Sequence, residues 1–251
     1  MTTPNDSLDF YPTPDSLAFD MVFSLREVKS GFTTYPKPIL EPSAGDGALA
    51  RQVHALAFNV HHDYKTGEVD QYDKGKARST ELDCIELSSD FRAVLKKDGF
   101  RVVHDNFLTF RPTTKYAAIV MNPPFSEGAR HLLKALDIMQ DGGKIRCLLN
   151  AETLRNPCTN ERKELAARLE ALHATVKYYP DAFKNARRAA HVEVALVSVD
   201  IPDREPVSRI RLDLKKADYP EFRPQEIAGM RVIIIDDDPQ VCEDVTAILE
   251  A

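Results

Sequence analysis

The chain has 251 residues, of which 43% are hydrophobic and 29% charged, and this is enough for one sizeable α/β domain with a short extension. It contains no run of about 18 apolar residues, so no membrane span is expected. The first nine residues are polar and acidic, unlike a signal peptide, and we expect a cytoplasmic protein. The net charge of -6 argues against tight, stand-alone binding of duplex DNA, and four scattered cysteines predict no metal centre.

Strand and helix signals alternate along most of the chain. Helices are predicted from residue 15 and at 48–58, 89–97, 129–140 and 161–172. Strands are predicted at 38–41, 82–86, 101–104, 116–121 and 144–149, followed by a closing hairpin from 175–179 and 191–199. Residues 59–80 are polar and lack an apolar period, which predicts a long mobile loop. The alternation indicates a parallel sheet covered by helices on both faces, which binds ligands at the carboxyl ends of its strands.

The first predicted strand runs into a glycine-rich turn that opens a helix, Glu41-Pro42-Ser43-Ala44-Gly45-Asp46-Gly47. Its glycines allow a sharp turn and a close approach to a ligand. A pyrophosphate site favours positive potential, whereas this turn carries two acids and lacks the lysine of a P-loop. The acids suit a cofactor with a sulfonium and an α-ammonium group. A purely structural turn is the alternative.

Two further strand ends carry acids. Glu86 ends the strand at 82–86, where a ribose diol needs acceptors. Asp105-Asn106-Phe107 follows the strand at 101–104, and its carboxylate is suited to accept from an adenine amino group while Phe107 covers the ring. A turn or helix-cap aspartate is the alternative for Asp105.

A buried strand at 116–121 leads into the tetrad Asn122-Pro123-Pro124-Phe125. An aryl amine is a poor nucleophile because its lone pair is delocalised into the ring. Two acceptors aimed at its N–H bonds, the Asn122 side-chain oxygen and the Pro123 carbonyl, favour the pyramidal form and free that lone pair. Phe125 is suited to stack on the base. The tetrad therefore predicts methyl transfer to a planar exocyclic amine, with a duplex substrate flipping its base out.

The remaining features are less specific. Residues 150–188 contain eight lysines and arginines and five acids. This local excess of positive charge fits a solvated helix surface as well as a nucleic-acid contact. Residues 203–251 form a C-terminal extension of unknown role after a main domain at 1–202. Its apolar stretch at 230–235 suggests either a tail strand on the main sheet or the stub of a larger protein.

Taken in order, these motifs resemble the class I S-adenosylmethionine-dependent DNA adenine-N6 methyltransferases whose cofactor motifs precede the catalytic one. The matching segments are Tyr-Pro-Thr-Pro (11–14), the turn at 41–47, Ile-Glu (85–86), His-Asp-Asn-Phe (104–107) and Asn-Pro-Pro-Phe (122–125). Residues 145–164 resemble methyltransferase-like proteins of phages and other mobile elements. The resemblance covers residues 8–202.

The resemblance implies a Rossmann-like α/β fold, with a seven-stranded, mostly parallel sheet, helices on both faces and an antiparallel last strand. It also implies that Tyr11 and Thr13 contact the methionine part of S-adenosylmethionine, and that the ribose and adenine contacts are those given above. Phe183 is implied to be the second aromatic that sandwiches the flipped base with Phe125.

The expected activity is therefore methyl transfer from S-adenosylmethionine to N6 of adenine in DNA, leaving S-adenosylhomocysteine. Family members that read a DNA site carry a recognition domain, whereas here only the acidic residues 203–251 follow the core. We expect either low specificity, or recognition supplied by a protein partner or a further domain. The alternatives are RNA (guanine-N2 or adenine-N6), a protein glutamine amide, or a non-catalytic anti-restriction-type binder.

Overall fold

The computed structural model describes residues 11–29, 32–57, 60–62, 69–71, 81–183 and 192–203. All of them belong to one compact unit that spans Met1–Arg204. The predicted C-terminal extension lies outside the described residues from residue 204 onward. Among the described helices, none is both long and apolar enough to cross a membrane.

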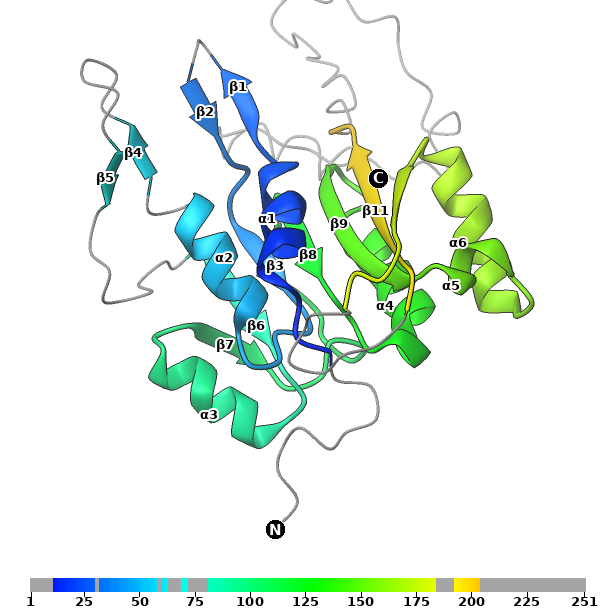
Figure 1. Ribbon diagram of the computed structural model, residues 1–251, viewed down its shortest axis with the longest axis horizontal. Helices are drawn as coiled ribbons and strands as arrows, with labels where there is room; N and C mark the ends of the chain where they lie inside the picture. Colours follow the sequence, from blue (N-terminus) through cyan, green and yellow to red (C-terminus); the bar gives the residue numbers. More distant parts are fainter. Residues whose placement is uncertain are drawn as a thin grey trace, which may run out of the picture. The chain divides into compact units, whose positions relative to one another are not determined.

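A seven-stranded sheet with the order β10-β11-β9-β8-β3-β6-β7 forms the centre of this unit (Figure 1). Its five parallel strands are β3 (Ile39–Glu41), β6 (Leu82–Ile85), β7 (Arg101–His104), β8 (Ala118–Met121) and β9 (Gly143–Asn150). The last strand, β11 (Val194–Ile201), runs antiparallel to both β9 and β10 (Thr175–Tyr179). The predicted Rossmann-like sheet with a reversed last strand is confirmed.

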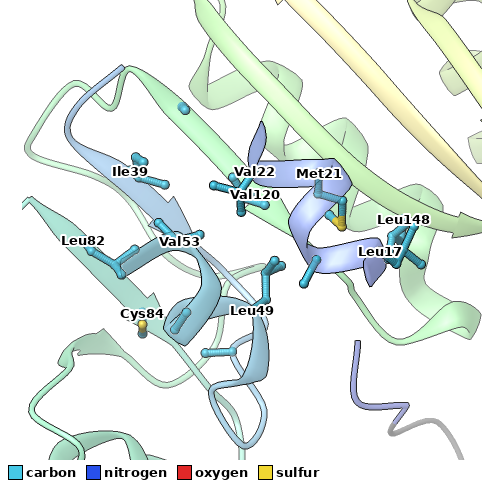
Figure 2. Packing of buried hydrophobic residues seen from close by; sticks show 14 of the residues in the cluster. Leu17, Met21, Val22, Ile39, Leu49, Val53, Leu82, Cys84, Val120 and Leu148 are labelled. Atoms are coloured by element: carbon cyan, nitrogen blue, oxygen red, sulfur yellow. The ribbon is translucent and has the colours of Figure 1, made fainter. Parts of the chain in front are cut away.

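Helices cover both faces of the sheet. One face carries α1 (Asp15–Phe23), α2 (Ala48–Ala57) and α3 (Ser89–Lys97), and the other carries α4 (Gly128–Ile138), α5 (Glu152–Arg155) and α6 (Asn160–Ala171). Successive strand residues alternate between the two cores, as with Ile39 and Leu40 on β3. Figure 2 shows the first core, where Leu17 and Met21 of α1 and Leu49 of α2 lie over the sheet strands.

The order in which the chain adds strands to the sheet reverses at β3. It passes from β3 to β6 on one side, and later returns to place β8 on the other side of β3. Such a switch point leaves a crevice outside the carboxyl ends of the strands, where ligands bind in open α/β sheets. The predicted motifs at 41–47, 86 and 122–125 directly follow β3, β6 and β8.

Two short hairpins were not predicted. β1 (Glu27–Lys29) pairs with β2 (Phe32–Thr34), and β4 (Val60–His62) pairs with β5 (Val69–Gln71), both antiparallel. The second pair lies within residues 59–80, so the prediction of a loop without regular structure is wrong for these six residues. Strands of three residues are too short for a period-two pattern to be visible in the sequence.

Candidate active site

A cavity of about 370 Å³ lies beside the ends of β3, β6 and β8, within the size range of small-ligand sites. Four stretches of the chain, at 11–13, 41–49, 86–91 and 122–125, contribute its walls. The lining residues are Tyr11, Pro12, Thr13, Glu41, Ser43, Ala44, Gly45, Asp46, Ala48, Leu49, Glu86, Leu87, Ser88, Phe91, Asn122, Pro123, Pro124 and Phe125. The structure therefore brings the predicted cofactor turn and the predicted amine tetrad into one cavity.

The glycine-rich turn is held against β6 by its backbone. The Ala44 N–H donates to the Ile85 carbonyl at 3.0 Å, and the turn closes through Gly45 and Gly47 at φ 54° and 85°. A Cβ at Gly47 would also lie 3.0 Å from Leu95, so a larger residue is disfavoured there. Gly47 and the buried Pro42 belong to this turn and are not among the residues that line the cavity.

Glu41 is a buried carboxyl group in the cavity wall. Its side chain is 1% exposed, and its Oε2 atom has no hydrogen-bond partner within the described residues. Burial, followed by the nearby charges of Glu86 and Asp46, raises the pKa of Glu41 well above its usual range. A buried carboxylate with a bare oxygen favours a proton or a cationic ligand beside it.

Glu86 links the two loops on this side of the sheet. Its Oε2 accepts from the Gly45 N–H at 2.7 Å, and its Oε1 accepts from the Ser88 N–H at 2.7 Å. Each carboxylate oxygen has a second lone pair, so Glu86 keeps the capacity to accept from a ligand hydroxyl. Asp46 has a partly structural role, because its Oδ1 accepts from the Ala48 N–H at 3.1 Å at the start of α2.

Asn122 is held by the N-terminal segment. Its Nδ2 donates to the Tyr11 carbonyl at 2.9 Å and to the Thr13 hydroxyl at 3.0 Å. Both amide N–H groups thus have acceptors, and no donor from the described part of the chain bonds the amide oxygen. Asn122 lines the cavity, and its amide oxygen keeps the capacity to accept a hydrogen bond.

Three aromatic rings meet beside Asn122. Tyr11 stacks on Phe125 with 5.3 Å between ring centroids, and Phe183 packs edge-on against both, at 5.7 and 5.9 Å. Phe183 is fully buried and does not line the cavity. In this structure, Tyr11 therefore covers Phe125, and Phe183 supports the two rings from the core.

The three residues after β7, Asp105 to Phe107, were predicted to contact the cofactor adenine, but they are not among the residues that line the cavity. The Asp105 side chain is 63% exposed and lies 3.3 Å from His104 Nδ1. Asn106 closes the turn by accepting a backbone N–H two residues on. Phe107 is buried in the core on the α4 face, 5.6 Å from the His131 ring. The turn after β7 thus directs Phe107 into the core, and none of the three lines the cavity.

Several cavity residues were not singled out from the sequence. Leu87 is the most telling, since 72% of it is exposed beside Glu86, and Phe91 of α3 adds a second apolar surface. An exposed leucine in a cavity wall suits the face of a planar ring. The signal was present in the sequence, because Leu87 comes directly after Glu86, the acid that follows β6.

In the described part of residues 150–188, several basic side chains are paired with acids from elsewhere in the chain. Arg155 pairs with Glu193, Arg168 lies 2.8 Å from Asp137, and Lys177 lies 3.5 Å from Asp20. These pairs favour the solvated-face alternative over a dedicated nucleic-acid contact.

No family model matches the chain, and no curated protein does. Solved structures do match. A protein from Pyrococcus horikoshii, described as a candidate RNA methyltransferase, shares 18% identity over 82% of this chain and 91% of that chain, with a TM-score of 0.50. A dimethyladenosine transferase from Plasmodium falciparum shares 13% identity over 76% and 63%, with a TM-score of 0.50. A type I restriction-modification methyltransferase subunit from Streptococcus thermophilus shares 16% over 76% and 45%, with a TM-score of 0.52.

These likenesses concern the fold. The described unit has the seven-stranded sheet and the reversed last strand of the Rossmann-like methyltransferase structures that it matches. The chain spans less than half of the restriction-modification subunit. The protein therefore shares the Rossmann-like fold of these structures.

Proposed function

We propose that this chain binds S-adenosylmethionine in the cavity at 41–49 and transfers its methyl group to the exocyclic amine of a nucleobase, with N6 of adenine in DNA as the first candidate. The observation that carries the proposal is Asn122 in the cavity wall, whose two amide N–H groups have acceptors, whereas no donor among the described residues bonds its amide oxygen. This is the acceptor that an aryl amine needs before it can attack an electrophile.

The cavity residues fit the cofactor group by group. The bare Glu41 oxygen suits an ammonium group, and the remaining lone pairs of Glu86 suit ribose hydroxyls. Leu87 and Phe91 offer apolar surface to a purine ring. When bound, the cofactor supplies a methyl group on a positively charged sulfur, which needs no covalent nucleophile from the protein.

The amine site orients the acceptor base. The Asn122 amide oxygen and the Pro123 carbonyl accept from the two N–H groups of the amine, which frees its lone pair. The N–CH3 bond forms as the methyl–sulfur bond breaks, and the nitrogen then loses one proton to solvent. Phe125 supplies a face for stacking. Because the Tyr11 ring stacks on Phe125 at 5.3 Å, a base that uses that face requires the Tyr11 ring to move aside.

RNA is the second candidate acceptor. The Pyrococcus horikoshii and Plasmodium falciparum structures bear names that refer to RNA methylation and dimethyladenosine formation. An adenine amine makes the same demands in either nucleic acid, so the cavity alone suits both.

The test is methyl transfer from isotopically labelled S-adenosylmethionine into separate pools of unmethylated DNA, RNA and cell protein, followed by mass spectrometry of the digests. We expect label in N6-methyladenine from the DNA pool. Asn122→Ala is expected to lower transfer at least 100-fold, since loss of one preorganised polar group costs about that much, with cofactor affinity within a few-fold.

Label confined to RNA would move the proposal to the second candidate. Label confined to protein would contradict the nucleobase assignment. Cofactor binding without transfer into any pool would indicate a non-catalytic binder. Equal turnover by wild type and Asn122→Ala would show that the amine site lies elsewhere.

A further inference from the structure

We propose that Thr13 is a positioning residue for methyl transfer. Together with the Tyr11 carbonyl, its hydroxyl holds the Asn122 amide so that the amide oxygen faces the acceptor amine. This inference rests on the proposed function. It gives Thr13 a role in the chemical step, distinct from contact with the cofactor.

The orientation of the amide follows from the chemistry of its two partners. The Tyr11 carbonyl only accepts hydrogen bonds, so the atom 2.9 Å from it must be the amide nitrogen. Turning the amide by 180° would place two acceptor oxygens in contact. Thr13 Oγ1 accepts the second N–H at 3.0 Å, which sets the rotation of the group.

The segment that makes these contacts is rigid. Pro12 and Pro14 flank Thr13, and each proline fixes its own φ and restricts the residue before it to extended conformations. Thr13 itself is 7% exposed. Two acceptors held in this way are preorganised, so that ordering Asn122 costs little during the reaction.

Helix α1 continues this segment and is anchored at both ends. Its residues Leu17 and Met21 are buried in the core over the sheet (Figure 2). Just beyond its last turn, the buried Arg146 of β9 donates to the Ser24 hydroxyl at 2.8 Å and to the Ser24 carbonyl at 3.0 Å. Thr13 is thus tied to the same sheet that carries Asn122 at the end of β8.

Thr13 also lines the cavity, so two roles must be separated. A residue that only contacts the cofactor affects cofactor affinity. A residue that positions Asn122 affects the chemical step and leaves cofactor affinity nearly unchanged. Thr13→Val removes the acceptor with almost no change in shape, and Thr13→Ser retains the hydroxyl.

The experiment compares wild type with Thr13→Val, Thr13→Ala and Thr13→Ser, using methylation of unmethylated DNA and RNA for kcat and calorimetry with S-adenosylhomocysteine for Kd. Loss of one hydrogen bond predicts a kcat about tenfold lower in the valine variant, a Kd within threefold, and recovery in the serine variant. Thr153→Val is the matched control, because Thr153 is also buried (2% exposed) and does not line the cavity. Thermal melting checks that each variant is folded.

A Thr13→Val variant that loses cofactor affinity with unchanged kcat would overturn the proposal, and so would one that matches wild type in both. A second measurement tests the contact between Thr13 and Asn122 even when the wild-type protein transfers no methyl group. In protein labelled with ¹⁵N-asparagine, the side-chain amide signals of Asn122, assigned through Asn122→Asp, are expected to shift in the valine variant and not in the serine variant. That shift without transfer would reject the proposed function and keep the Thr13 contact, whereas unshifted signals would reject the contact.

Discussion

Two buried carboxyl groups on adjacent strands have opposite surroundings. Asp83 of β6 is 2% exposed, and the Arg101 guanidinium donates to both of its oxygens while the Tyr116 hydroxyl donates at 2.7 Å. Glu41 of β3 is 1% exposed, and its Oε2 has no partner among the described residues. Burial is equally costly for both groups, but only that of Asp83 is offset from within the protein.

The comparison separates a structural group from a site for a ligand. The Asp83 cluster joins β6 to Arg101 of the neighbouring β7 and to Tyr116, which lies just before β8. Burial together with the Asp83 bond raises the pKa of Tyr116. Glu41 has no comparable set of partners among the described residues, so its burial lowers the stability of the fold. A buried group that is kept at this cost suits a role in ligand binding. Groups that stabilise a fold are satisfied in the empty protein, whereas groups that bind are completed by their ligand.

The same contrast applies to a second cavity among the described residues. This larger one, of about 870 Å³, lies at the opposite edge of the sheet and carries three lysines. Lys115 lies 3.3 Å from Asp203, Lys144 lies 3.0 Å from Glu27, and Lys37 is paired in the same way with a glutamate. Its size exceeds that of the candidate site, but its charges are already compensated.

The largest expected effect on stability comes from Asp83→Asn. It removes the charge that pairs with Arg101, and breaking such a pair costs about 3–5 kcal/mol when both partners are buried. Arg101 is half exposed, so we expect about 1–3 kcal/mol, or a Tm roughly 3–10 °C lower. Cofactor affinity should change by less than about twofold. A Tm equal to that of wild type would show that Asp83 does not stabilise the fold, and would contradict the difference drawn between Asp83 and Glu41.

Glu41→Gln should have the opposite effects to Asp83→Asn, with a lower cofactor affinity and no loss of stability. We expect cofactor affinity to fall at least about tenfold, since a hydrogen bond to a charged group contributes about 1.5–3 kcal/mol. The Tm of the ligand-free protein at neutral pH should stay the same or rise, because a neutral amide replaces a buried carboxyl group whose ionisation is opposed by burial. Calorimetry with S-adenosylmethionine and thermal melting measure the two quantities. Affinity within twofold of wild type would remove Glu41 from the site.

The raised pKa of Glu41 also predicts a pH dependence. In the ligand-free folded protein, the raised pKa favours the protonated form of Glu41. The contribution of Glu41 to folding stability is therefore fully present below the usual glutamate pKa, and it is lost as the pH rises through the raised pKa of the folded protein. A cationic ligand favours the carboxylate instead. Binding at a pH below the raised value should therefore release a proton, and affinity should rise with pH until Glu41 is ionised. Calorimetry in buffers of different ionisation enthalpy should detect this release in wild type and not in Glu41→Gln.

The smallest expected effect is that of Leu87→Ala. Its side chain is 72% exposed, so removing it should hardly affect the Tm. If it covers the purine ring of the cofactor, affinity should fall about three- to tenfold, as expected for partial loss of one apolar side chain. Val94→Ala is a matched control, because Val94 is 40% exposed on α3 and does not line the cavity. Equal affinity for both variants would show that the ring lies elsewhere.

Much of the fold was predictable because its signals are local. The apolar run at 118–121, the glycines at 45 and 47 and the proline-flanked Thr13 each specify a strand, a turn or a helix start from neighbouring residues. The hairpins β1–β2 and β4–β5 were missed because three-residue strands carry too little pattern. Phe107 was assigned to the cofactor, yet a backbone turn directs it into the core, where it meets His131 of α4.

By itself, the sequence determined the order of strands and helices and the residue types at the strand ends, because both depend on residues close together in the chain. The tertiary structure alone decided which buried carboxyl group has partners and which way the Asn122 amide faces. Asp83 meets Tyr116 from 33 positions away, and Asn122 meets Tyr11 from 111 positions away. Such contacts form only when the sheet and helix α1 bring distant segments together, so no local pattern encodes them.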